Sequence, residues 1–368
     1  YTNAESSAAS DVYKRQQLAD ASLTQAQQRA YFYVLYEASL TKKDLVMATE
    51  TAEQLLALSR SQAVLGDNFK VSADDLWRLY EQIGERAGNQ YNLLKGNDTT
   101  WYKRAGDIQK KEPARARGMY AVVAFTTNED AKRQLAHKEI ADSLSITDGG
   151  LEVVNQLYMQ SSKAGSPDNL PAEVRYRLVD HALSVGDITL AATMMASLPQ
   201  PPEGEEYFNW QMRKARVLIL EGEYEQGETA LKMSLQNIKE LNTDMIDRYL
   251  QVVFDLQTVK RHEQALELFD LLPVAAMEDK LKREIYYWKA ESNYEIERYG
   301  QAAMLYMKSA KAADETMTDL WAQSARFKAS DALLKAGLYD DAQYAYSELL
   351  RITSSDSRKR LIRQKLQH

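Results

Sequence analysis

Cysteine is absent from the 368-residue chain. Its absence excludes disulfides, thiolate nucleophiles and cysteine-ligated metal sites together. Histidine is scarce, and none of the four histidines has a second histidine or a carboxylate four residues away, the spacing that makes a helical metal site convincing. We therefore predict no metal site and no bound cofactor.

Signatures of catalysis are also missing. Apart from Gly149-Gly150, the 15 glycines are scattered singly, and none precedes a lysine-serine or lysine-threonine pair as a phosphate-binding loop requires. No serine occupies the Gly-x-Ser-x-Gly elbow of the hydrolases. We predict that the chain is not an enzyme and that it has no catalytic residues.

Long apolar runs are lacking as well. The longest unbroken apolar stretch, Met119 to Phe125, is far shorter than the roughly 18 residues that a membrane-spanning helix needs, so we expect no transmembrane segment in this sequence. The formal net charge of -7 argues against a general nucleic-acid binder, whose footprint is basic. What is present is a hydrophobic content of 45%, which is ample for a folded core.

Proline occurs only seven times, always between apolar-periodic segments and never inside one. Because proline disrupts a helix interior, this placement indicates that nearly every ordered segment is a helix. Apolar residues recur three and four positions apart, which is the helical spacing, and strand signals are close to absent. The clearest segments are Tyr31 to Leu40, Leu45 to Leu58, Ala114 to Phe125 and Ala131 to Leu144. The sequence predicts an all-α protein.

A repeat emerges in the second half, where expected helix pairs share a small residue early in the second helix. These small residues are Ala191, Gly227, Ala265, Ala302 and Ala342, spaced by 36, 38, 37 and 40 residues. A bulky residue follows each by four positions: Met195, Leu231, Phe269, Tyr306 and Tyr346. The turn before the second helix carries Gly186, Gly222, Lys260, Glu297 and Gly337 in turn. Glycine favours a helix that ends in the left-handed conformation, so we expect such turns here.

Three of these turns carry a recognisable motif, at Glu221 to Gly227, Glu297 to Ala302 and Ala336 to Ala342. The sequence here resembles the tetratricopeptide repeat (TPR) family, over five repeats between about Glu173 and Arg351. The spacing departs from the family's common 34-residue period. The resemblance implies a right-handed α-solenoid of helix-turn-helix hairpins, in which stacked neighbours bury a shared core and form a concave wall.

Four regions are expected along the chain. Residues 6–16 resemble an in-frame translation of a sequencing adapter, so we expect residues 1–16 to be a disordered artefact, with the natural start lost. Residues 17–160 are expected to form more divergent helical hairpins, and residues 161–171, rich in Ser, Gly, Pro and Asn, a linker. Residues 172–368 are expected to hold the five TPR-like repeats and a C-terminal capping helix. No capping glycine or asparagine ends the expected last helix, so we expect the C-terminus to be cut as well.

The resemblance also implies a partner-binding surface, because the family's template places the outward-facing residues of each first helix on the inner wall. These candidate groove residues are Tyr176, Arg177, Asp180, Met212, Arg213, Arg216, Gln251, Phe254, Tyr287, Trp288, Glu291, Phe327, Lys328 and Asp331, with Leu250 beside Gln251. These residues mix apolar and charged side chains, which suits the binding of an extended peptide or a helix. An ordinary solvated groove is the alternative reading.

The leading functional hypothesis is a non-catalytic scaffold or adaptor in a bacterial assembly, resembling envelope-associated members of the family. The alternative is the non-catalytic helical arm, or an activating domain, of a cell-wall enzyme such as a lytic transglycosylase or a synthase regulator. A cytoplasmic peptide-sensing or nucleic-acid-linked regulator is a third class. The analogy favours a periplasmic or outer-membrane-anchored location over the cytoplasm. The sequence identifies neither the protein partner nor the oligomeric state.

Overall fold

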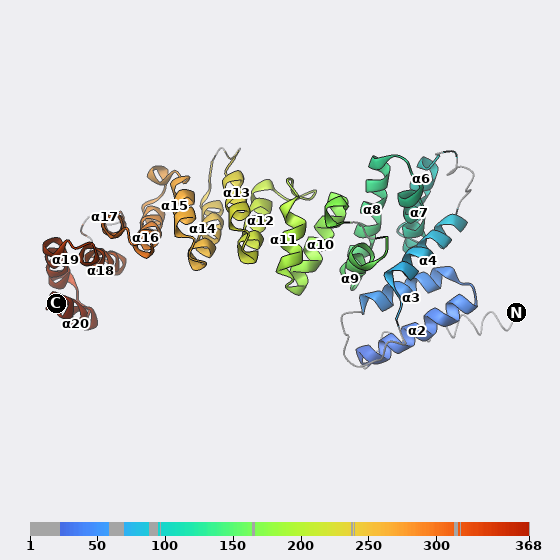
Figure 1. The fold of residues 1–368 in the computed structure, drawn as a ribbon, viewed down its shortest axis with the longest axis horizontal. Helices are drawn as coiled ribbons and strands as arrows, with labels where there is room; N and C mark the ends of the chain where they lie inside the picture. The colour runs from blue at the N-terminus through green and yellow to red at the C-terminus, as the bar shows by residue number, and fades with distance from the viewer. Residues whose placement is uncertain are drawn as a thin grey trace. The chain divides into compact units, whose positions relative to one another are not determined.

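The computed structural model describes residues 23–58, 70–87, 97–163, 166–236, 240–312 and 318–367, together with Lys95, Ile238 and Thr316. Over these residues every regular element is helical, with 18 α-helices and three short π or 3-10 segments (Figure 1). The prediction of an all-α protein is therefore confirmed. Residues 1–16, with the adapter-like stretch, lie outside the described residues. No helix in the described ranges is long and apolar enough to cross a membrane.

The chain divides into two compact units between Pro202 and Glu203, and the expected linker at residues 161–171 lies within the first of them. The N-terminal unit contains α2 (Gln25–Thr41), α3 (Leu45–Ala57), α4 (Ala73–Arg86), α6 (Thr99–Ile108), α7 (Pro113–Thr126), α8 (Asp130–Ser145), α9 (Gly150–Asn155), α10 (Ala172–Val185) and α11 (Ile188–Ala196). A π-helical segment, η2 (Gln156–Gln160), extends α9, and a 3-10 turn, η3 (Pro167–Asn169), precedes α10.

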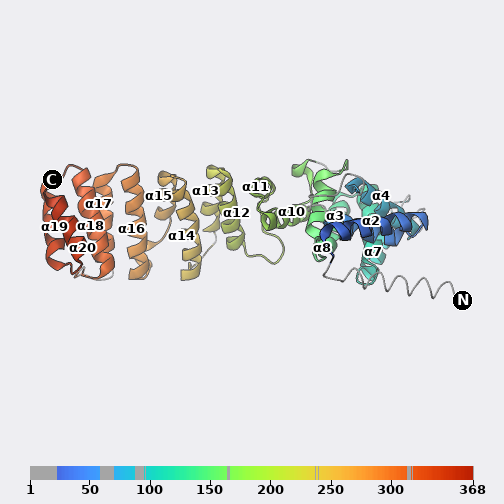
Figure 2. The ribbon, with the colours of Figure 1, turned by 90° about the horizontal axis from the view of Figure 1, so that it is seen from below.

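The C-terminal unit contains α12 (Tyr207–Glu221), α13 (Tyr224–Ser234), α14 (Thr243–Thr258), α15 (His262–Asp270), α16 (Asp279–Glu295), α17 (Tyr299–Lys311), α18 (Leu320–Lys335), α19 (Tyr339–Ile352) and α20 (Asp356–Leu366). A 3-10 turn, η4 (Val274–Ala276), precedes α16. Helices pack mostly against their neighbours in sequence, and Figure 2 shows them following one another in a row within this unit. This packing is consistent with a helical repeat array.

The turns between paired helices share one backbone feature. Gly186, Gly222 and Gly337 have φ angles of 73°, 98° and 77°, in the left-handed region where glycine has no steric penalty. Lys260 and Glu297 stand at the equivalent turns and adopt the same conformation, with φ angles of 61° and 63°. The left-handed turns expected at these five positions are confirmed, and the two non-glycine residues hold a conformation that is unfavourable for them.

The small and bulky residues of the repeat are core residues, as the spacing predicts. The four repeat alanines and all five bulky residues are at most 1% exposed. Gly227 is the remaining small residue, and a Cβ there would lie 2.6 Å from Cγ1 of Ile219 and 3.1 Å from the carbonyl oxygen of Ala215. A small side chain at this position therefore lets the second helix of a hairpin approach the first.

The N-terminal unit is less regular, because α4 packs closely against α7, across α6 in the sequence. Two glycines make this crossing possible: a Cβ on Gly84 would lie 2.2 Å from the carbonyl oxygen of Gly118. The same region buries a charged pair, in which Arg117 on α7 binds Glu53 on α3. Helices α4 and α7 also contribute residues to a cleft described below.

Candidate partner-binding strip and a second cleft

The candidate groove residues fall on first helices of both units. Tyr176, Arg177 and Asp180 lie on α10 in the N-terminal unit, and the others lie on α12, α14, α16 and α18 in the C-terminal unit. The two groups are described separately. We use the name strip for the C-terminal group only.

On α10 the candidate side chains hold the N-terminal unit together. Nε of Arg177 donates to Oδ1 of Asp142 on α8 over 2.8 Å, and its Nη1 lies 3.3 Å from Oδ2 of Asp180. The hydroxyl of Tyr176 donates to the carbonyl oxygen of Gln200 over 2.8 Å. These contacts fix α10 against α8 and the loop after α11, so the three side chains already have partners within the chain.

On α12 the strip begins with a residue that the structure buries. Met212 is 6% exposed and packs in the core of the C-terminal unit, so it offers a partner almost no surface. Leu250 on α14 is likewise buried, at 3%. Arg213 bonds to Glu205 over 2.8 Å, and Nε of Arg216 lies 3.2 Å from Oδ2 of Asp255 on α14.

The centre of the strip is a run of half-buried aromatic rings, which we call the aromatic row: Phe254, Trp288, Tyr287 and Trp321. The Phe254 and Trp288 ring centroids are 5.0 Å apart, those of Trp288 and Tyr287 5.5 Å, and those of Tyr287 and Trp321 5.2 Å. The row joins α14, α16 and α18. Gln251, one turn before Phe254, is exposed, whereas Phe327 packs on Tyr346 at 5.7 Å.

Trp321 was not among the candidate residues. It precedes Lys328 by seven positions, so the two share a face of α18, and that spacing is the signal that could have found it. The other three rings of the row were candidates. The family's template assigns the same positions in every repeat. It does not assign an aromatic residue to the first turn of one helix alone.

The charges of the strip tie neighbouring first helices to each other. Glu291 on α16 accepts from the Tyr306 hydroxyl over 2.7 Å and lies 3.0 Å from Nζ of Lys328 on α18. Asp331 on α18 accepts from the Tyr294 hydroxyl over 2.8 Å and from Lys365 on α20 over 2.5 Å. The strip therefore presents aromatic carbon more than unpaired charge.

The protonation of Asp331 follows from these contacts. Burial acts to raise the pKa of its carboxyl group, but the hydrogen bonds from Lys365 and Tyr294 outweigh burial and leave the pKa below its usual value. The carboxylate is therefore ionised at neutral pH and keeps its tie to α20. Asp331 acts here as a bridge between helices.

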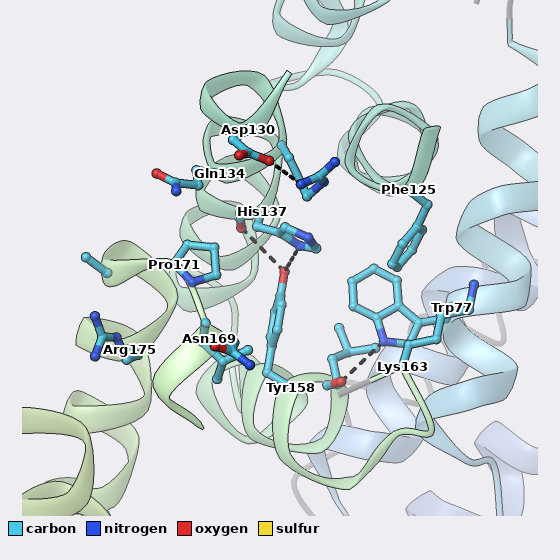
Figure 3. Close-up of a pocket in the computed structure, with 14 residues that line it drawn as sticks. Trp77, Phe125, Asp130, Gln134, His137, Tyr158, Lys163, Asn169, Pro171 and Arg175 are labelled. Carbon is cyan, nitrogen blue, oxygen red and sulfur yellow. Dashed lines mark hydrogen bonds and ion pairs between the residues drawn. The ribbon is translucent and has the colours of Figure 1, made fainter. Parts of the chain in front are cut away.

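A separate cleft of about 620 Å³ lies in the N-terminal unit, between α4, the end of α7, α8, η2 and the start of α10 (Figure 3). Sequence reasoning missed it, because its lining comes from segments far apart in the chain. Trp77, Phe125, His137 and Tyr158 form an aromatic wall, and their ring centroids lie 5.1 Å apart for Trp77 and Phe125 and 5.6 Å apart for His137 and Tyr158. Arg133, Lys163 and Arg175 line the same cleft.

Within the described ranges, no group of three or more histidines and carboxylates is arranged to hold a metal ion. His137 in the cleft has aromatic neighbours and Arg133 rather than carboxylates around its ring. The chemistry available at both surfaces is thus apolar contact, hydrogen bonding and charge.

Comparison with known proteins does not place the chain in a family. No family model matches it, and no curated protein is significantly similar to it. The geometry of the strip and of the cleft is therefore the basis for a functional interpretation.

Proposed function

We propose that the chain is a non-catalytic TPR-like repeat protein that binds a segment of a partner protein along the strip of its C-terminal unit. Two features support the TPR-like assignment: the left-handed turns recur in five consecutive hairpins, and a small residue is buried early in each second helix. In repeat arrays each hairpin buries its apolar face only against its neighbours, which leaves one continuous surface along the first helices.

The aromatic row is the observation that carries the binding proposal. Its four rings are half-buried, so each has one face packed on the core and keeps part of its surface in contact with solvent. Tyrosine and tryptophan are enriched where proteins bind each other, because they bury a large area with few rotatable bonds. A row of such rings along three helices offers several anchor points to one elongated ligand.

The charged residues of the strip indicate which kind of partner segment fits it. Glu291 and Asp331 already have cationic partners within the strip, so breaking those pairs on binding would be unfavourable. Gln251 is exposed, so it is available for a polar contact at the edge of the row. The preferred partner segment is an extended peptide or amphipathic helix with apolar or aromatic anchors and few charges.

A peptide selection tests this proposal. A random peptide library displayed on phage is screened on the purified chain, and the Kd of enriched peptides is measured by fluorescence anisotropy. We expect Trp288→Ala to weaken binding at least tenfold, as truncation of an aromatic anchor does at protein interfaces. Trp288→Phe keeps a ring and should retain most of the affinity.

Tyr344→Ala is the matched control, because Tyr344 is 70% exposed on the second helix α19 and outside the strip. Helical circular dichroism of each variant shows that the fold is intact. Enrichment of no peptide, or equal Kd values for Trp288→Ala and Tyr344→Ala, would refute the proposed binding surface.

A further inference from the structure

The cleft of the N-terminal unit is a second, separate feature that the peptide-binding proposal does not use. Its volume of about 620 Å³ falls in the range of small-molecule sites, which are concave and lined by apolar side chains with a few polar groups. All of its lining residues belong to the N-terminal unit. It is therefore a property of that unit alone.

Of the four rings of the aromatic wall, Phe125 has the most exposed surface, whereas Trp77 and Tyr158 are only 1% and 3% exposed. The polar atoms of the wall are used internally: Nε1 of Trp77 donates to the carbonyl oxygen of Leu157 over 3.2 Å, and the Tyr158 hydroxyl lies 3.0 Å from Nδ1 of His137. Phe125, at the end of α7, is 39% exposed. Its ring thus suits a flat apolar group, which can meet it edge to face.

Three cationic side chains line the cleft, and one of them has no carboxylate partner. Arg133 pairs with Asp130 over 2.5 Å, and Lys163 pairs with Glu81 while its Nζ lies 4.2 Å from the centre of the Phe125 ring. Nη1 of Arg175 bonds to the hydroxyl of Ser197 over 2.5 Å, its Nε is buried, and Arg175 forms no ion pair among the described residues. Arg175 is therefore the group in the cleft that can take an anion.

The cation and the wall are separated along the cleft. Figure 3 shows Trp77 and Phe125 toward one end and Arg175 with Pro171 toward the other, with His137 and Tyr158 between them. Burial, with the nearby positive charge of Arg133, lowers the pKa of His137 to about 4, so the imidazole is neutral at pH 7 and adds no charge to the middle of the cleft. A ligand that fits both ends has a flat apolar body and an anionic group beyond it.

We infer that this cleft binds a small organic anion with an aromatic ring, such as an aryl carboxylate, with the ring against Phe125 and the carboxylate at Arg175. Arginine suits this role because its planar guanidinium can donate two parallel hydrogen bonds to one carboxylate. Phe125 contributes affinity, and Arg175 contributes selection for charge.

Two probes with the same ring and opposite charge test the inference by isothermal titration calorimetry on the full chain at pH 7. Indole-3-propionate should bind with a Kd below about 1 mM, which is typical for a ligand of this size. Tryptamine, which carries an ammonium group in place of the carboxylate, should bind at least tenfold more weakly. Equal affinities, or no binding of either probe, would overturn the inference.

Variants locate the site. Arg175→Gln should weaken indole-3-propionate at least tenfold, since a hydrogen bond to a charged group is lost, whereas Arg175→Lys should recover part of the affinity. Phe125→Ala should weaken the probe as well. Arg104→Gln and Ile146→Ala are the controls, because both residues are exposed in the same unit and neither lines the cleft. Unchanged affinity in Arg175→Gln and Phe125→Ala would show that the probe binds elsewhere and contradict the assignment.

Discussion

Arg117 on α7 has a guanidinium group that is almost completely removed from solvent, with 2% of its side chain exposed. Its Nε and Nη2 donate to the two carboxylate oxygens of Glu53 over 2.9 and 2.5 Å, and its Nη1 donates to Ser143 over 2.9 Å. The Tyr80 hydroxyl donates to Glu53 over 2.6 Å. The network joins α3, α4, α7 and α8, so its charges are both desolvated and satisfied.

Removing one member of this pair should be strongly destabilising. Arg117→Met leaves Glu53 buried without its counter-charge, and we expect a loss of about 3–5 kcal/mol in the free energy of unfolding of the N-terminal unit. The double variant Arg117→Met, Glu53→Leu should recover most of that loss, because no unpaired charge remains. Urea denaturation measures both, and a loss under about 1 kcal/mol in the single variant would contradict the buried pair.

His137 gives the N-terminal unit a pH dependence of defined sign. Burial, aided by the positive charge of Arg133, lowers the pKa of His137 to about 4 in the folded protein, whereas the unfolded chain takes up this proton near pH 6.5. As the pH falls from about 6.5 to 4, protonation therefore favours the unfolded state, by up to about 3 kcal/mol. Above pH 6.5 the group has no effect on stability.

Thermal unfolding from pH 7 to pH 4 checks this. The wild-type chain should lose stability over that window, and His137→Gln, which does not titrate, should lose measurably less. Equal slopes in the two proteins would show that His137 is protonated in the folded state, contrary to its buried position.

At the scale of the elements, the turns of the repeat hold two residues in an unfavourable backbone conformation. Lys260 and Glu297 have positive φ angles where three other turns have glycine. A left-handed conformation is unfavourable by about 1–2 kcal/mol for a residue with a Cβ, and substitution by glycine relieves this strain. Part of the relief is offset, because glycine has greater conformational freedom in the unfolded chain. We expect Lys260→Gly and Glu297→Gly each to stabilise the C-terminal unit by up to about 1 kcal/mol.

Gly222→Ala is the counterpart, because Gly222 has a φ angle of 98° and alanine there is strained. It should destabilise the same unit, and urea midpoints of the three variants provide the comparison. Destabilisation by the two glycine substitutions would mean that Lys260 and Glu297 contribute contacts that outweigh their backbone strain.

The elements also show which features could be predicted from the sequence. The left-handed turns were predictable because three glycines mark the repeat, and the buried alanines because small and bulky residues alternate at helical spacing. Met212 was misplaced because the family template was given more weight than the helix's own pattern: Phe208, Met212, Ala215 and Ile219 share one apolar face of α12, which is the core face. The cleft was out of reach, since it depends on how α4, α7, α8 and η2 pack, and no local pattern encodes that.

At the scale of the whole molecule, the division after Pro202 predicts that residues 203–368 fold without the rest of the chain. The main core cluster of this unit, from Phe208 to Ile285, is drawn entirely from its own helices. We expect the segment expressed alone to give a helical circular dichroism spectrum and a cooperative thermal transition. A spectrum without helical signal would mean that the first hairpins are needed for folding.

The same division separates two proposed binding functions. The aromatic row on α14, α16 and α18 is proposed to bind a protein segment, and the cleft between α4, α7 and α8 is proposed to bind a small aryl anion. Each binding site can be mutated without altering the other, at Trp288 in the C-terminal unit and at Arg175 in the N-terminal unit. If both are correct, the two variants have independent effects on peptide and probe binding.

Site-specific photo-crosslinking tests the central claim, that a partner segment lies along the aromatic row, most directly. p-Benzoylphenylalanine replaces Gln251, which is exposed beside Phe254, or Met304, which is 58% exposed on the second helix α17. With a selected, labelled peptide, irradiation should produce a cross-link from position 251 that excess unlabelled peptide removes, and none from position 304. Equal cross-linking at both positions, or cross-linking at position 304 alone, would contradict the account.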